Sequence, residues 1–511
     1  MSDLYTDYLN EHAALAPFYS AWPRALFEKP PASHLWDPSL VDALRAYQQQ
    51  LGVPKAFDGN GPVIITGQQP GFFTGPLYTI YKAITAVRVA EELTRRHGTR
   101  CIPIFWVGSE DHDFEEAREA FVLSKNHEPV SFRYTPEADV QGLPMYRVPV
   151  EPSLHAMIDA MAERVPGSEM REPVRAVLHE TLDASGSLSD WTARLLAHLF
   201  RDTPLLVFSP HLTEARRRAT PVIERAIAEP LTGTRLLNDA GTKLGALGYA
   251  AQVVKGAEDC TFFLEVDGRR RKVSCDGISF FIGDTDLRYT AGELLDILRN
   301  EPERFSPNVA LRCVVQQHLF PVAAYVAGPG EIAYWGQLCE FFAHYQQPMP
   351  VVYPRARCVL TTIKLNKLVR KLGLDLADLH GEADAVLEKA LALGSRGAVV
   401  KQFHTYRNQI EATLAAMERE MNGGTATTSL HERVVQELDR CERALLRADE
   451  VVLEATRGQV LRVCNALAPW RRPQERVYTV FSYLFEHGTD LIARLTREMD
   501  VTSFNLNEIE L

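Results

Sequence analysis

The sequence lacks any uninterrupted apolar run of the roughly 20 residues that a membrane-spanning helix requires. Its first residues, Met1 to Tyr5, contain no basic segment leading into an apolar one, so no secretory signal peptide is predicted. Basic residues are not in excess either, because 55 Lys and Arg stand against 66 Asp and Glu, a formal net charge of −11. We therefore expect a cytoplasmic protein that binds neither membranes nor nucleic acid, and the alternative of a local basic cleft stays open.

Cysteine is scarce, and the eight cysteines are scattered. No two of them form a C-x-x-C pair, so neither a thiolate zinc site nor a thioredoxin-type motif is predicted, and we expect buried thiols. The chain also has no G-x-S-x-G, no H-E-x-x-H and no P-loop ending in G-K-[ST]. No tight metal site is predicted, and hydrolysis by a catalytic triad is disfavoured.

At 511 residues and 46% hydrophobic composition, the chain is globular and too long for one ordinary core. A buried strand at 62–66, a glycine-rich loop at 67–75, a helix at 76–97 and a second strand at 101–107 form a βαβ unit, which implies a parallel sheet. Further strands are predicted at 205–209, 322–327 and 350–354, with a β-hairpin over 262–281 turning at Asp267-Gly268. We expect an α/β core over residues 1–355, with inserted segments at about 118–165 and 255–310.

Beyond about residue 356 the composition shifts to Ala, Leu, Glu and Arg. Apolar residues at three- and four-residue spacing predict two helices on either side of Gly423-Gly424. The apolar residues of the first helix are Phe403, Tyr406, Ile410, Leu414, Met417 and Met421. Those of the second helix are Leu430, Val434, Leu438, Cys441, Leu445, Ala448 and Val452. An antiparallel coiled coil is predicted over 356–472, with 473–511 packing back on the core. The long arms favour an exposed seam and hence a homodimer; alternatively, both helices pack on the parent domain.

The glycine-rich loop and the helix after it form the first candidate site. A glycine loop between a parallel strand and its helix directs backbone N–H groups toward an anion such as phosphate. Lys82 lies one helical turn after Tyr78, on the same face. The polar and glycine residues proposed to bind here are Thr66, Gly67, Gln68, Gln69, Thr74 and Gly75. The alternative is a tight turn without a ligand.

A cluster of acidic residues with one histidine follows the second strand. Glu110, Asp111, His112 and Asp113 offer a general base, a cation ligand or a clamp for an ammonium group. Asp113 with Glu116 also fits a D-x-x-E capping box for the next helix. Both interpretations of Asp113 stand at this point.

The third candidate site is another glycine loop opening a helix, after the strand at 322–327. Gly328 and Gly330 form the loop, and Glu331 and Tyr334 share a helix face. Upstream, Arg312 and Gln316 could present a guanidinium toward a carboxylate or phosphate. Glu331 could instead be a first-turn residue favoured by the helix dipole. Because all three loops follow parallel strands, they should converge on one cleft, suited to nucleotide-assisted carboxylate activation or group transfer.

These stretches resemble the bacillithiol-biosynthesis cysteine-adding enzymes, a family also called bacillithiol synthases or cysteine ligases. The matching segments are Ile65 to Gly71, Gly75 to Tyr78 with Lys82, Trp106 with Glu110 to Phe114, Gly328 to Glu331 with Tyr334, and Pro473 to Arg476. The resemblance implies a Rossmann-like, nucleotidyltransferase-like core with connecting insertions and a coiled coil that makes the dimer. Ala468 to Arg472 departs from the glycine-containing turn of the family.

The resemblance also implies an activity, that of a ligase that joins L-cysteine to the amine of malyl-glucosamine. ATP, with Mg²⁺ where needed, would activate the carboxylate as an acyl-adenylate or an acyl-phosphate. Lys82 would be a charge clamp. Asp111 and His112 would hold or deprotonate the amine, and Arg312 and Glu331 would orient the substrates. The alternatives are a nucleotidyl or group transferase acting on another small metabolite, and a nucleotide-binding coiled-coil adaptor without catalysis.

Overall fold

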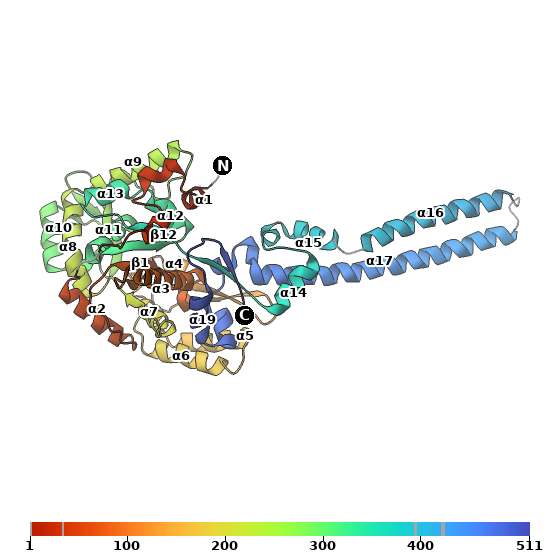
Figure 1. Cartoon of the computed structure of the whole chain (residues 1–511), viewed down its shortest axis with the longest axis horizontal. Helices are drawn as coiled ribbons and strands as arrows, with labels where there is room; N and C mark the ends of the chain where they lie inside the picture. Colours follow the sequence, from red (N-terminus) through yellow and green to blue (C-terminus); the bar gives the residue numbers. More distant parts are fainter. Residues whose placement is uncertain (1–2, 33–34, 393–395, 421–424) are drawn as a thin grey trace. The chain divides into compact units, whose positions relative to one another are not determined.

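A computed structural model of the chain describes residues 3–32, 35–392, 396–420 and 425–511 (Figure 1). The chain divides into two compact units. The first comprises Met1–Lys125, Val130–Cys358 and Glu475–Asn507, and the second comprises Asn126–Pro129, Val359–Gln474 and Glu508–Leu511. Each unit is described by itself below.

The core of the first unit is a five-stranded sheet in which every neighbouring pair is parallel. Its strands, in spatial order, are β12 (Val351–Pro354), β11 (Val322–Ala327), β1 (Val63–Gln68), β2 (Ile102–Val107) and β5 (Leu206–Phe208). Numbered along the chain, this order is 5-4-1-2-3, the doubly wound arrangement of Rossmann-like folds. The direction of winding reverses between β1 and β11. The five predicted core strands are confirmed to within two residues at each end.

The central strands read as apolar runs because both faces of the sheet are covered. All six residues of β2 are buried, and so are five of the six in β1. Helix α3 (Tyr78–His97) packs against β1 and β2, and α7 (Leu188–Leu199) against β2 and β5. Leu77 and Gly98 flank α3, and Gly98 ends it in the left-handed conformation (φ 70°) that glycine adopts readily.

The other helices of the first unit surround this core. They are α1 (Leu4–Leu9), α2 (Pro38–Gln50), α4 (Phe114–Ala117), α5 (Ser153–Arg164), α6 (Arg171–Asp183), α8 (Thr213–Ala228), α9 (Thr232–Ala246), α10 (Ala291–Asn300), α11 (Val309–Leu319), α12 (Pro329–Trp335), α13 (Cys339–His344), α18 (Phe481–His487) and α19 (Asp490–Glu498). Strands β3 (Glu119–Leu123) and β4 (Pro129–Arg133) form a two-stranded sheet.

A second, antiparallel sheet follows α9. Its spatial order is β10 (Phe305–Pro307), β6 (Asp259–Val266), β7 (Arg269–Cys275), β8 (Phe280–Ile282) and β9 (Arg288–Tyr289). The predicted turn at Asp267-Gly268 is confirmed, with φ of 51° and 74° as a type I′ hairpin requires. The second arm of the predicted hairpin is corrected to two strands. Asp276 Oδ1 accepts the amides of Ile278 and Ser279 at 2.8 Å each, which turns the chain between β7 and β8.

The second unit is mainly helical. It contains α14 (Ile363–Leu372), α15 (Ala383–Ala392), α16 (Arg396–Glu420) and α17 (Thr425–Leu467), with β13 (Arg357–Thr361) paired to β14 (Leu506–Glu510). Helices α16 and α17 pack on each other. Their ion pairs run in opposite directions along the two helices, Arg407 to Asp439 at 2.7 Å and Glu418 to His431 at 3.0 Å, so the predicted antiparallel coiled coil is confirmed.

Only some of the regularly spaced apolar residues of the coiled coil are covered in this structure. Half-buried positions are Phe403, Leu414, Val434, Leu438 and Leu445, whereas Tyr406, Ile410, Met417, Leu430 and Cys441 are exposed. Met421 and the Gly423-Gly424 turn lie outside the described residues, and the side chains of Ala448 and Val452 are likewise not described. Within the described side chains of 402–420 and 429–445, none is buried.

Five of the eight cysteines are buried thiols, as predicted. Cys339 and Cys464 are half-buried, and Cys441 on α17 is exposed, so the prediction of a buried thiol is wrong for Cys441. Among the described residues, no helix is both long enough and apolar enough to cross a bilayer.

We expect His211, next to the carboxyl end of β5, to make the stability of the first unit depend on pH. Its Nδ1 lies 2.7 Å from Ser209 Oγ and its ring stacks on Tyr146. Burial, with the nearby Arg216 charge, lowers the pKa of His211 to about 4. Since the folded protein takes up this proton less readily than the unfolded chain, stability is lost as pH falls from about 6.5 to about 4, by at most about 3 kcal/mol.

The measurement is urea unfolding of the wild type and of His211→Gln at pH 7 and pH 4.5. We expect the variant to lose less free energy of unfolding than the wild type between these two pH values. Equal losses in the two proteins would show that His211 does not contribute to the dependence.

Candidate functional site

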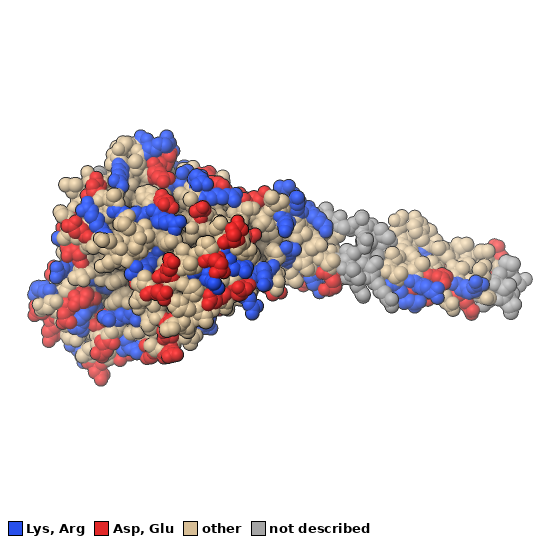
Figure 2. Space-filling view, turned by 90° about the horizontal axis from the view of Figure 1, so that it is seen from below, with Lys and Arg blue, Asp and Glu red and all other residues tan. Residues whose placement is uncertain are grey.

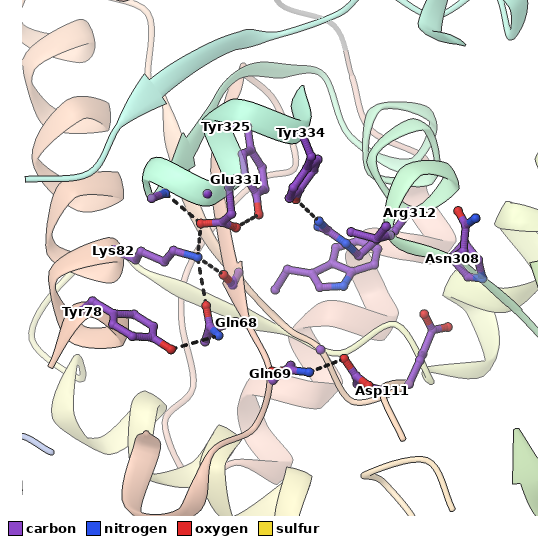
Figure 3. Close-up of a pocket in the computed structure, with 18 of the residues that line it drawn as sticks. Gln68, Gln69, Tyr78, Lys82, Asp111, Asn308, Arg312, Tyr325, Glu331 and Tyr334 are labelled. Carbon is purple, nitrogen blue, oxygen red and sulfur yellow. Dashed lines mark hydrogen bonds and ion pairs between the residues drawn. The ribbon is translucent and has the colours of Figure 1, made fainter. Parts of the chain in front are cut away.

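A cavity of about 560 Å³ opens at the carboxyl ends of β1, β2 and β11. Residues from all three predicted loops line it (Figure 3): Gly67, Gln68, Gln69, Gly108, Glu110, Asp111, Gly328, Gly330 and Glu331. The cavity lies where the sheet reverses its winding, which is where open α/β sheets bind ligands. The prediction that the three loops share one pocket is confirmed.

The first loop brings the backbone close to the neighbouring strand. A Cβ on Gly67 would lie 2.7 Å from the Trp106 carbonyl oxygen, so only glycine fits there. Further along, Phe73, Thr74 and Gly75 have φ of 50°, 66° and 71°, and this left-handed run turns the chain into α3. Thr74 and Gly75 are buried and do not line the cavity. Thr66 does not line it either, because its Oγ1 donates to the Val326 carbonyl at 3.0 Å.

Lys82 is the best-defined charge in the site. Its side chain is 2% exposed, and its ammonium donates to Gly67 O at 2.8 Å, to Gln68 Oε1 at 3.0 Å and to the Glu331 carboxylate. Burial lowers the pKa of Lys82, and the adjacent carboxylate opposes that shift. The three acceptors use all three ammonium donors, so Lys82 ties the first loop to the third.

Glu331 is the matching anion. Its Oε2 accepts the Gly328 amide at 2.8 Å, at the start of α12, and its Oε1 accepts the Tyr325 hydroxyl at 2.7 Å. Burial would raise the pKa of Glu331, but the Lys82 ammonium and these hydrogen bonds outweigh it and lower the pKa. Glu331 lies in the first turn of α12, as the helix-dipole interpretation predicted, and its carboxylate also lines the cavity.

The second loop separates its four polar residues. Asp111 lines the cavity, with Oδ1 accepting the amides of His112 at 2.7 Å and Asp113 at 3.0 Å and Oδ2 accepting Gln69 Nε2 at 2.6 Å. Burial would raise the pKa of Asp111, but these hydrogen bonds and the Arg270 charge lower it. Glu110 lines the cavity from a buried ion pair with Arg216 at 3.0 Å.

His112 and Asp113 do not line the cavity. Asp113 caps α4 by accepting the Glu116 amide at 3.2 Å, which is the Asp113 half of the predicted capping box. His112 Nδ1 lies 3.1 Å from Arg270 Nη1. Because a guanidinium only donates, Nδ1 must accept, and burial together with Arg270 lowers the pKa of His112, so the ring is neutral at pH 7.

Arg312 projects from α11 toward the cavity, and its Nη2 donates to the Tyr334 hydroxyl at 2.8 Å (Figure 3). Tyr334 and Tyr78 also line the cavity. Gln316, one turn after Arg312, is 1% exposed and does not line it. Its amide has no hydrogen-bond partner among the described residues.

Sequence reasoning missed several cations that line the cavity: Lys255, Arg270 and Arg355. Arg270 lies on β7, where Nε donates to Ser306 Oγ at 2.8 Å and Nη2 to Pro307 O at 2.7 Å. The four consecutive cations from Arg269 to Lys272 could have indicated a cationic site, but such a run on a strand usually lies at a solvent-exposed edge of a sheet. Lys255 had no local signal. Arg476, in the matched segment ending the resemblance, also lines the cavity.

The charges in the cavity are not balanced. Lys82 is paired with Glu331, and Arg355 with Glu475 at 2.5 Å. Among the described residues, the other lining cations, Lys255, Arg270, Arg312 and Arg476, have no carboxylate within ion-pair distance. Asp111 is the only lining carboxylate in the described chain without a cationic partner at that distance. A cationic cavity in a chain of net charge −11 suits a ligand with several negative charges.

Comparison with known proteins covers both units. Residues 1–356 match the family model described as "Bacillithiol biosynthesis BshC, N-terminal Rossmann-like domain", and residues 358–511 match "Bacillithiol biosynthesis BshC, C-terminal coiled-coil domain". Proteins named "Putative cysteine ligase BshC" are similar along most of their length. That of Salinibacter ruber is 31% identical over 509 residues, covering 96% of this chain and 93% of its own. That of Symbiobacterium thermophilum is 30% identical, covering 96% and 94%.

Proposed function

Because this chain belongs to the bacillithiol biosynthesis BshC family, we propose that it is a ligase that joins the carboxyl group of L-cysteine to the amine of malyl-glucosamine. The observation that carries the proposal is the set of lining cations without carboxylate partners, Lys255, Arg270, Arg312 and Arg476. Cysteine, the malyl group and a nucleotide all bring negative charge. A cavity of about 560 Å³ also falls within the usual range of small-molecule sites.

The reaction needs activation, because a carboxylate and an ammonium do not condense at neutral pH. ATP, when bound, would supply this activation, either as an acyl-adenylate with release of pyrophosphate and then AMP, or as an acyl-phosphate with release of ADP and then phosphate. Cations that lack a carboxylate partner fit a polyphosphate. Among the described residues, no group of three or more His, Cys, Asp and Glu side chains is placed to hold a metal ion, so we assign no protein ligand to Mg²⁺.

The proposal gives separate roles to the paired and unpaired charges. Lys82 holds Gly67 O and Gln68 in place and keeps a positive charge at the cavity wall. Asp111, ionised at neutral pH, holds the incoming ammonium and takes its proton. Arg312, with one hydrogen bond to Tyr334, offers its remaining N–H groups to a carboxylate or phosphate.

The test is to incubate the purified full-length protein with L-cysteine, malyl-glucosamine and ATP, and to follow the products by mass spectrometry. We expect the cysteinyl amide together with AMP or ADP, and no product when any one of the three is omitted. Nucleotide turnover with another acceptor but not with malyl-glucosamine would favour a transferase. Nucleotide binding without any turnover would favour an adaptor.

We also propose that the coiled coil binds a second copy of this chain. Tyr406, Ile410 and Met417 on α16 are 53%, 39% and 46% exposed, and their spacing puts them on one side of the helix. Figure 2 shows charged side chains gathered along one side of this helical pair, between the two grey segments, next to an uncharged side. Two helices with no buried side chain among their described central residues gain a core when they pack against another pair.

Light scattering after gel filtration tests the dimer. The wild type should have twice the mass of one chain at micromolar concentration, and Tyr406→Glu combined with Met417→Glu should shift it to the monomer mass. Arg440→Glu, on the exposed charged surface of α17, is the matched control and should remain a dimer. A monomeric wild type, or a dimeric double variant, would contradict the proposal.

A further inference from the structure

Glu475 fixes the chain at the edge of the cavity. The residue is buried, and both of its carboxylate oxygens are used: Oε1 accepts Arg355 Nη2 at 2.5 Å and Oε2 accepts the Cys358 amide at 3.1 Å. Arg355 is itself buried, lines the cavity and lies 5.6 Å above the Tyr78 ring. The backbone at Glu475 is therefore held next to a wall of the site.

The chain is fixed again just after Arg476. The Tyr478 carbonyl accepts the Leu77 amide at 2.8 Å, at the start of α3. Thr479 Oγ1 donates to the Phe73 carbonyl at 2.7 Å, and the Thr479 amide donates to Phe121 O at 2.9 Å. Arg476 is thus held between two attachment points, one on Arg355 and one on the glycine-rich loop, so its backbone position relative to the cavity is set.

The Arg476 side chain also lines the cavity. It is exposed, and among the described residues it has no hydrogen bond and no ion pair. Arg476, Arg355 and Tyr78 all line the cavity, and among the described residues Arg355 has a carboxylate partner, Glu475, whereas Arg476 has none. An arginine held in position at a site wall with all five N–H donors free is matched to an oxyanion.

We propose that Arg476 is a substrate-binding residue that contacts an oxyanion, a nucleotide phosphate or a substrate carboxylate, at the Tyr78 side of the cavity. The inference rests on the proposed function for the choice of ligands. It assigns a binding role to the segment that follows the coiled-coil domain, which packing alone does not require, because the neighbouring contacts of Glu475 and Thr479 already hold the chain there.

Titration calorimetry on the full-length protein tests the contact without turnover. The probes are ATP, adenosine, malyl-glucosamine and L-cysteine, and the variants are Arg476→Ala and Arg476→Lys. Arg472→Ala is the matched control, since Arg472 is an exposed arginine four residues upstream that does not line the cavity. We expect Arg476→Ala to weaken one anionic ligand by about 10- to 100-fold, Arg476→Lys to weaken it less, and Arg472→Ala to change nothing.

The pattern of losses identifies the oxyanion. Weaker ATP binding with unchanged adenosine binding assigns a phosphate, whereas weaker malyl-glucosamine or cysteine binding with unchanged ATP binding assigns a carboxylate. Affinities all within twofold of wild type would overturn the proposal. The proposal would also be overturned if Arg472→Ala lost as much affinity as Arg476→Ala. The same holds if Arg476→Ala weakened adenosine binding as much as ATP binding and also lowered the melting temperature, or if the wild type bound none of the probes.

The two proposals can fail separately. A wild type that forms no cysteinyl amide removes the ligase function, while the titrations still decide whether Arg476 contacts an anion. Conversely, a wild type that forms the amide while Arg476→Ala keeps every affinity leaves the function standing and removes Arg476 from the binding site.

Discussion

Replacing Lys82 with methionine is expected to lower kcat/KM by about 100-fold or more and to lower the free energy of unfolding by about 3–5 kcal/mol. The activity is lost because the cavity wall loses a positive charge and the tie between Gly67, Gln68 and Glu331. The stability is lost because the Glu331 carboxylate is left without its cation. Initial rates by mass spectrometry and urea unfolding by circular dichroism measure the two effects.

A double variant separates these effects. Combining Lys82→Met with Glu331→Gln removes both charges, and the glutamine oxygen can still accept the Gly328 amide while its NH2 group donates to the Tyr325 hydroxyl oxygen. We expect the double variant to recover most of the free energy of unfolding while its rate stays low. If the rate recovers together with the stability, Lys82 supports only the fold and the charge-clamp role is wrong.

Replacing Asp111 with asparagine is expected to lower kcat by about 10²- to 10⁴-fold. Asparagine nearly matches the shape of aspartate, but its amide cannot take a proton and would turn a donor toward Gln69 or toward the amides of His112 and Asp113. Because the pKa of Asp111 lies below its ordinary value, this carboxylate stays ionised as the pH falls from 8 to 5. Asp111 should therefore not produce the acidic limb of the pH–rate profile.

His112→Gln is the matched comparison for Asp111→Asn. The glutamine oxygen can replace Nδ1 as the acceptor for Arg270, so we expect less than a tenfold loss of kcat. Initial rates of both variants over pH 5 to 9 decide between the two residues. A larger loss in His112→Gln than in Asp111→Asn would make the histidine the base and leave Asp111 as the residue that orients the loop.

The parallel core could be predicted because its signals are local. The strands at Val63–Gln68 and Ile102–Val107 are nearly continuous apolar runs between turn residues, as strands covered on both faces must be. Once the strands are parallel, the loops after them lie at the same edge of the sheet. The convergence of Gln69, Asp111 and Glu331 on one cavity follows from that topology alone.

Whether each of these side chains is buried or faces the cavity could not be predicted in the same way. Thr74 is polar and lies in a glycine-rich loop, but its φ of 66° belongs to a turn that buries it. Gln316 has helical spacing from Arg312, yet it faces the interior, where its amide has no partner among the described residues. Backbone angles in a loop depend on what packs around it, and this sequence contains no regular pattern that reports them.

The ion-pair partners of the charged residues could not be predicted from the sequence either. Glu110 pairs with Arg216, 106 positions away along the chain, and Glu475 pairs with Arg355 across 120 positions. Arg270 reaches the cavity from the second sheet, through hydrogen bonds to Ser306 and Pro307. Any carboxylate in the sequence could have been the partner of any cation, because burial makes the pairing necessary but does not choose it.

By itself, the amino-acid sequence determined the α/β core, the helical pair and the three loops, since hydrophobic periodicity and glycine placement act within a few residues of each other. Only the tertiary structure decided which charges are neutralised and which face the cavity unpaired. That outcome depends on contacts between segments far apart in the chain, such as the ion pair of Arg355 with Glu475. Because charges interact through space and not along the chain, the net charge of the site can be determined only from the folded structure.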